Sequence, residues 1–171
     1  SNGDGDFTFS RTTAATRVNK DGFIEDVNVD VPRLDYSDGG CPSLLLEPAR
    51  INRVFPNNSL TGYTLIGVTT SNNQTTAPNG ANEGAKVQAT TSGTAVVFKG
   101  FSGTSGVTHN ISAFVKAGTH NQIRLLEGFS SSRIDVNLST GTEVSSQNAT
   151  NKKIEAYPNN WYRVSFDFTS T

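Results

Sequence analysis

The chain has 171 residues, of which 34% are hydrophobic, and its net charge is −1 from 14 basic and 15 acidic side chains. This length allows one domain and an additional segment, and the scattered, balanced charge disfavours nucleic-acid binding. No run of about 18 apolar residues is present that would insert into a membrane. Ser, Thr, Asn and Gly dominate the remainder, so the composition predicts an all-β fold with many turns. The single cysteine, Cys41, excludes an intrachain disulfide.

Residues 1–56 are expected to form an extended arm. Asp4 and Asp6 stand among glycines, and their carboxylates are candidates for a structural Ca²⁺ site, with a flexible start as the alternative. A turn at residues 19–22 separates two extended pieces, and Pro32 ends the second of them. The segment has too little apolar mass to fold alone. We therefore expect it to dock onto a neighbouring domain or subunit.

Residues 57–171 are expected to form a separate module. We predict a strand around residues 61–69, a loop at 71–83, and strands in GAKVQATT and TAVVFKGF. Three runs follow in which apolar and polar residues alternate: HNISAFVKAG, NQIRLLEGF and NNWYRVSFDF. The segment RIDVNLSTG lies before the last of them. Each of the three has one apolar and one polar face, which predicts that they are three strands of one sheet in a sandwich.

The polar face of these three runs is the candidate binding surface. If Ile111, Ile123, Val164 and Phe166 point into the core, the opposite face presents Ser112, Phe114, Gln122, Arg124, Arg163, Ser165 and Asp167. Aromatic rings with planar polar groups suit a sugar ligand, but a solvated antiparallel sheet has the same composition. Trp161 is the third residue of the last run, and it either packs against the module or stacks on a sugar.

The motifs along the chain resemble a family of bacteriophage tail and virion-associated proteins. The arm of that family is matched by three motifs: TRVN with a Gly after it, PRLDY, and LLLEP. Its carbohydrate-binding module is matched by SAFVKAG, IRLLEG, DVNLSTGTEV and NNWYRVSFDFT. The resemblance covers most of the chain and implies a jelly-roll β-sandwich preceded by an arm. Two departures are visible: Asn160 replaces the usual Gly before Trp161, and the family pattern continues beyond Thr171. We therefore expect either a fragment or a strand supplied by the arm or by a neighbouring subunit.

The resemblance also implies a virion or otherwise extracellular location, no catalytic machinery, and polysaccharide as the ligand. Other virion subunits are the expected protein partners, and a homotrimer is one arrangement that fits. The residues themselves give little support to catalysis, because His109, His120 and Cys41 lack metal-ligand spacing and Glu127 is expected to face away from Asp167. The alternatives are a virion assembly module that binds no sugar, and an accessory domain of a polysaccharide-degrading enzyme.

Overall fold

A computed structural model describes residues 9–46, 51–54, 56 and 58–171. These residues form short strands with a single 3-10 turn, so the predicted all-β class is confirmed. The chain divides into two compact units, Ser1–Arg50 and Ile51–Thr171, which are described separately below. The division lies six residues before the boundary expected from the sequence.

The described residues of the first unit, 9–46, form two pairs of antiparallel strands where the sequence suggested one extended arm. β1 (Ala15–Val18) pairs with β2 (Ile24–Val27), and β3 (Leu34–Asp35) pairs with β4 (Ser43–Leu44). The turn predicted at residues 19–22 joins β1 to β2. Its geometry is set by Asn19, whose Oδ1 accepts the backbone N–H of Asp21 and of Phe23 at 3.0 Å each.

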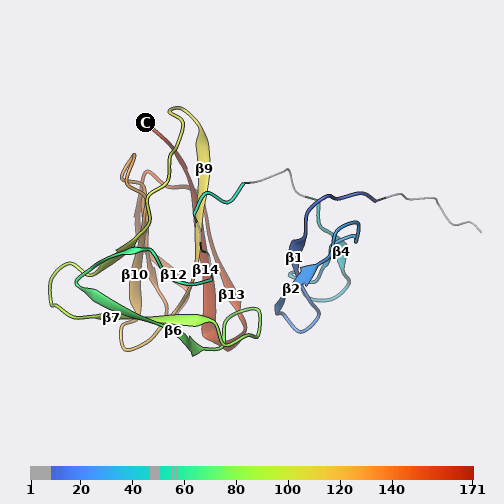
Figure 1. Cartoon of the computed structure of the whole chain (residues 1–171), viewed down its shortest axis with the longest axis horizontal. Helices are drawn as coiled ribbons and strands as arrows, with labels where there is room; N and C mark the ends of the chain where they lie inside the picture. Colours follow the sequence, from blue (N-terminus) through green and yellow to red (C-terminus); the bar gives the residue numbers. More distant parts are fainter. Residues whose placement is uncertain (1–8, 47–50, 55, 57) are drawn as a thin grey trace, which may run out of the picture. The chain divides into compact units, whose positions relative to one another are not determined.

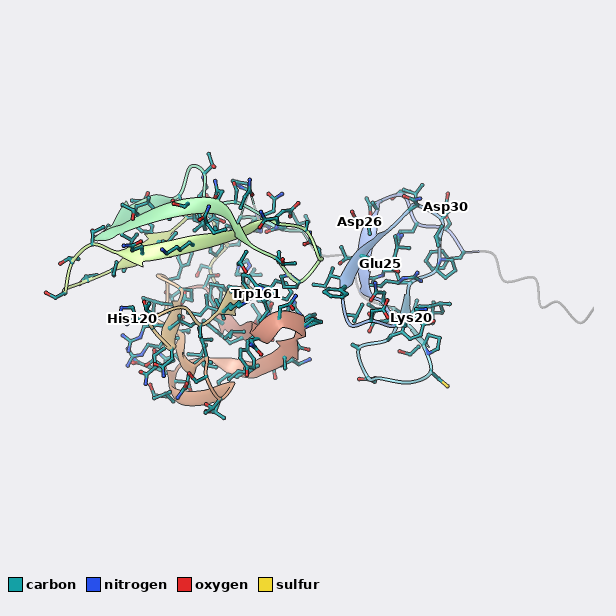
Figure 2. The ribbon with its side chains drawn as sticks, turned by 90° about the horizontal axis from the view of Figure 1, so that it is seen from below. Lys20, Glu25, Asp26, Asp30, His120 and Trp161 are labelled. Carbon is teal, nitrogen blue, oxygen red and sulfur yellow. The ribbon has the colours of Figure 1, made fainter. Side chains whose placement is uncertain are left out.

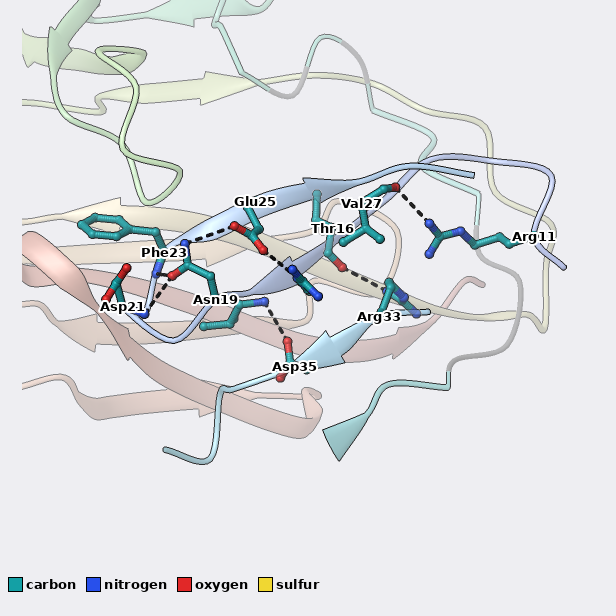
Figure 3. A network of polar contacts seen from close by, with 11 residues as sticks. Arg11, Thr16, Asn19, Asp21, Phe23, Glu25, Val27, Arg33 and Asp35 are labelled. Atoms are coloured by element: carbon teal, nitrogen blue, oxygen red, sulfur yellow. Dashed lines mark hydrogen bonds and ion pairs between the residues drawn. The ribbon is translucent and has the colours of Figure 1, made fainter. Parts of the chain in front are cut away.

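Polar contacts, more than apolar packing, hold the described part of this unit together (Figure 3). Asp35 is buried, and its Oδ1 accepts the backbone N–H of Val18 at 2.7 Å, which ties β3 to β1. Arg17 Nε donates to Glu25 Oε1 at 2.6 Å across the β1–β2 pair. Among the described residues of the unit, Val27 is the one buried hydrophobic side chain. Cys41 lies exposed between β3 and β4.

The second unit contains ten strands in its described residues (Figure 1). Their bounds are β5 (Thr64–Ile66), β6 (Val68–Thr75), β7 (Gly84–Ala89), β8 (Val96–Phe98), β9 (Thr108–Lys116), β10 (Gln122–Leu126), β11 (Arg133–Asn137), β12 (Thr142–Gln147), β13 (Thr150–Tyr157) and β14 (Trp161–Thr169). The 3-10 turn η1 (Pro158–Asn160) precedes β14. The residues predicted as a loop from position 71 instead continue β6 to Thr75, because they pair with β7 through an irregular register.

Two three-stranded sheets carry the core of this unit. The β9 sheet has the order β13–β14–β9, and the β11 sheet has the order β10–β11–β12. Their apolar faces meet in one cluster, in which Ile134, Val136 and Leu138 of the β11 side pack with Val164, Phe166 and Phe168 of β14. Because both sheets bury one face in the same cluster, their remaining faces point in opposite directions.

The prediction that the three alternating runs form one sheet is wrong. β9 and β14 pair along nine residues, but β10 pairs with β11 in the other sheet. The place beside β14 is taken by β13, which was not among the predicted strands. Alternation fixes which side of a strand is apolar, whereas the neighbouring strand is chosen by long-range pairing.

Candidate functional site

The outer face of the β9 sheet brings together four of the predicted site residues. The register places Arg163 opposite Phe114, Ser165 opposite Ser112, and Asp167 opposite Asn110. The intervening residues Val164 and Phe166 are fully buried in the core cluster. Side chains alternate along a strand, so Ser112, Phe114, Arg163 and Asp167 all point away from the core.

An aromatic pair stands at one end of this face. Phe114 and Tyr157 have ring centroids 5.1 Å apart with an interplanar angle of 87°, an edge-to-face contact. Phe114 is 38% exposed and therefore keeps ring surface available to a ligand. Tyr157 is the last residue of β13 and was not among the predicted site residues. The alternation of Lys153, Glu155 and Tyr157 with Ile154 and Ala156 is the sequence signal that could have found it.

Charged and amide groups continue the face beyond the aromatic pair. Arg163 Nη1 lies 3.3 Å from Glu155 Oε2, and both side chains are more than a third exposed. The carboxylate of Asp167 accepts hydrogen bonds from Asn110 Nδ2 and Asn151 Nδ2, each at 2.8 Å. Ser165 points the same way but is buried. We call Phe114, Tyr157, Arg163, Glu155, Asp167, Asn110, Asn151 and Ser112 the outer platform.

Gln122 and Arg124 are not part of the outer platform. They lie on the exposed face of the β11 sheet, opposite Asn137 and Asp135 respectively, and thus on the other side of the core. Arg124 is also engaged: its Nε and Nη2 donate to the two carboxylate oxygens of Asp135 at 2.6 and 2.9 Å. The hydrogen bond from Arg124, with another from Ser145, lowers the pKa of Asp135 to about 2. The predicted single platform is therefore divided between two surfaces.

Trp161 packs within the second unit. It is 7% exposed, and its Nε1 donates to the carbonyl oxygen of Thr76 at 2.8 Å. A Cβ built on Gly84 would come within 3.1 Å of Trp161 Cζ2, so the β6–β7 hairpin lies directly against the indole. Figure 2 shows Trp161 between this hairpin and the β9 sheet. Its ring has no open face for a sugar, and it is not included in the outer platform.

We expect Trp161→Phe to loosen the hairpin while the core remains folded. The substitution removes the N–H donor and leaves the Thr76 carbonyl without this partner, a loss of about 1–2 kcal/mol in the free energy of unfolding. Urea denaturation followed by circular dichroism would measure the loss. Amide hydrogen exchange should become faster in β6 and β7 and stay unchanged in β11. Equal acceleration in all three strands would contradict the assigned role.

The described residues contain no group of three His, Cys, Asp or Glu side chains placed to hold a metal ion. Asp4 and Asp6, the candidates for Ca²⁺, lie outside those residues, so that site stays a prediction. Within the same portion of the chain, no helix is long and apolar enough to cross a membrane. Glu127 is buried in the loop between β10 and β11, where its carboxylate accepts hydrogen bonds from Phe129, Ser130 and Ser132.

No family model matches the sequence, and no curated protein matches it. The geometry of the outer platform is therefore the basis on which a function is proposed.

Proposed function

We propose that the chain is a non-catalytic carbohydrate-binding module of a phage virion or tail protein. In this proposal its second unit is a jelly-roll sandwich, and its first unit docks onto other virion subunits. The outer platform holds a host-surface or environmental polysaccharide. The observation that carries the proposal is the Phe114–Tyr157 pair, in which Phe114 is exposed and Tyr157 is half-buried. It lies in the same face as the Arg163–Glu155 ion pair and the amides around Asp167.

The chemistry of the outer platform suits a sugar chain. Phe114 offers an apolar ring to the C–H groups of a pyranose, while guanidinium, carboxylate and amide groups can bind hydroxyls in pairs. From Phe114 to Asn110 the strand advances by about 13 Å, at roughly 3.3 Å per residue, which favours an extended ligand. A shallow surface of this kind binds weakly at each site, and several copies on one particle would raise the overall affinity.

We expect Phe114→Ala to weaken polysaccharide binding about tenfold, because the stacking surface is lost. Affinity gel electrophoresis against a panel of bacterial and environmental polysaccharides would measure the retention. Arg124→Ala is the matched control, since Arg124 is exposed on the opposite sheet, and it should leave retention unchanged. Loss of retention in Arg124→Ala, with Phe114→Ala unaffected, would contradict the assignment of the outer platform.

A virion assembly module without sugar binding is the second candidate. The observation that favours it is the two-stranded β5–β8 sheet, on which Ile66 and Phe98 are 49% and 46% exposed. Such residues are typical of protein interfaces when they lie together. Absence of retention on every polysaccharide, together with a stable oligomer in light scattering that Phe98→Asp dissociates, would favour assembly.

A further inference from the structure

An apolar face is exposed on the first unit. Leu34 and Leu44 lie directly opposite each other on β3 and β4, and both side chains are exposed. The backbone N–H of Leu45 donates to the carbonyl oxygen of Arg33 at 2.8 Å and so continues the strand pair. Alternation then points Leu46 to the same side as Leu44, where it is 72% exposed. We call Leu34, Leu44 and Leu46 the leucine face.

A second apolar face is exposed on the second unit. The register of the β5–β8 sheet places Ile66 opposite Val96, and Phe98 lies on the same side two residues further along β8. All three side chains are exposed, and so is every residue of β5. A sheet of only two strands is marginally stable in water, so a partner that covers these side chains would stabilise it. We call Ile66, Val96 and Phe98 the ribbon face.

The two units carry net charges of opposite sign. Residues 1–50 contain nine acidic and five basic side chains, a net charge of −4, and residues 51–171 contain six acidic and nine basic ones, a net charge of +3. Contact between the first unit of one molecule and the second unit of another is therefore electrostatically favourable. Contact between two copies of the same unit brings like charges together.

Single charges close to the two faces follow the same division. Asp38 is exposed in the connection between β3 and β4, the two strands of the leucine face. Lys99 directly follows β8, and its Nζ donates to the carbonyl oxygen of Gly62 at 2.8 Å, which holds the ammonium group near the start of β5. Within the described residues, Asp38 forms no ion pair with a base and Lys99 forms none with an acid. Both charges are therefore available to a partner of opposite sign.

These charges decide between the ways in which a second copy of the chain could cover the faces. Two ribbon faces placed together would bring two Lys99 side chains and two basic units to one interface. Two leucine faces placed together would do the same with Asp38 and two acidic units. A leucine face placed on a ribbon face buries as much apolar surface and joins opposite charges, so this arrangement is the favoured one.

We propose that the leucine face of one copy docks onto the ribbon face of a second copy of this chain. The proposal rests on the docking role proposed above for the first unit and specifies its partner. Each copy that uses its leucine face keeps a free ribbon face, and the reverse also holds. The contact is therefore head-to-tail, and it repeats from copy to copy until the assembly closes into a ring or extends as a filament.

Light scattering of the full chain tests the contact. The average mass of the parent should rise with protein concentration beyond that of a dimer, and this rise should weaken when the ionic strength increases from about 0.01 M to about 0.15 M. Leu46→Asp and Phe98→Asp each place a carboxylate in one apolar face, and each variant alone should associate at least about tenfold more weakly. Both side chains are exposed, so circular dichroism should show the parent fold in both variants.

An equimolar mixture of Leu46→Asp and Phe98→Asp separates the head-to-tail contact from its alternatives. The first variant keeps an intact ribbon face and the second an intact leucine face, so together they should form a one-to-one dimer that grows no further. If ribbon faces paired with each other, Leu46→Asp alone would still associate, and if leucine faces did, Phe98→Asp alone would. Either result would overturn the proposal, as would a mixture that stays monomeric or a parent that is monomeric at every concentration.

Val144→Asp is the matched control. Val144 is 54% exposed on β12 and belongs to neither face, so the same change in chemistry there should leave association unchanged. Ile66→Thr tests the ribbon face a second time, because threonine keeps strand propensity, and it should weaken association without loss of fold. Phe114→Ala, which tests sugar binding on the outer platform, should associate like the parent. Failure of the carbohydrate proposal and failure of this one therefore appear in different variants.

Discussion

Replacement of Phe166 by alanine should lower the free energy of unfolding of the second unit by about 3–5 kcal/mol. Phe166 is fully buried in the cluster that joins the two core sheets, and its ring makes an edge contact with Phe168. Truncation removes apolar contacts and leaves a cavity that the paired strands around it cannot close. Urea denaturation followed by the fluorescence of Trp161, which lies in the same unit, would measure the loss.

Phe98→Ala is the matched control for this prediction. The same change in chemistry is made at a ring that is 46% exposed on β8, so the expected loss is below about 1 kcal/mol. If the two variants lost equal stability, the core cluster would not be the main source of stability in this unit.

Glu127→Ala should cost about 3 kcal/mol, the second largest effect we expect. Glu127 is 3% exposed, and its carboxylate accepts the backbone N–H of Phe129, Ser130 and Ser132 as well as the hydroxyl of Ser130. Removing the carboxylate leaves three buried or half-buried N–H groups without this acceptor. The loop between β10 and β11 is then no longer held in its folded conformation by these hydrogen bonds. Chemical denaturation of the two proteins at pH 7 would measure the difference.

The stability that Glu127 provides should also depend on pH. Burial alone would raise the pKa of Glu127, but the hydrogen bonds from Ser130, Ser132 and Phe129 outweigh burial and lower the pKa. A lowered pKa means that the contribution is fully present above the pKa of the unfolded chain, about 4.3, and is lost as the pH falls through the folded value. The stability gap between the parent and Glu127→Gln should therefore narrow from pH 7 to pH 3. Asp135, with a pKa of about 2, loses its own contribution between about pH 4 and pH 2 in both proteins, so it does not affect the gap.

The direction of each side chain was the most predictable feature of the sequence. Alternation in the runs around Phe114 and Phe166 correctly separated core residues from outward residues, because apolar burial is a local property of a strand. The turn at residues 19–22 was likewise predictable, and Gly22 there has a positive φ of 81°, a conformation that favours glycine.

The partners of the strands were not predictable in the same way. The outer face of β13 is polar, and only Ile154 and Ala156 face inward. Its alternation of apolar and polar residues is therefore a weaker strand signal than that of β14. As a consequence Glu155 and Tyr157 were missed as neighbours of Arg163 and Phe114. Arg124 was placed with them because its strand alternates in the same manner, although pairing with β11 puts it on the opposite surface.

The first unit shows a different limit of sequence analysis. It was expected to be an extended arm because it has few apolar residues, and few are indeed buried there. Its compactness comes from hydrogen bonds between side chain and backbone, such as Asp35 to Val18, which leave no periodic pattern in a sequence.

The exposed thiol of Cys41 in the first unit and the buried indole of Trp161 in the second have a practical consequence. Each is the single residue of its kind in the chain, so one dye coupled to the native protein creates a defined donor–acceptor pair with one probe in each unit. Resonance energy transfer from the indole to that dye would follow changes in the separation of the two halves when polysaccharide or a neighbouring subunit is added. Neither probe needs an engineered residue.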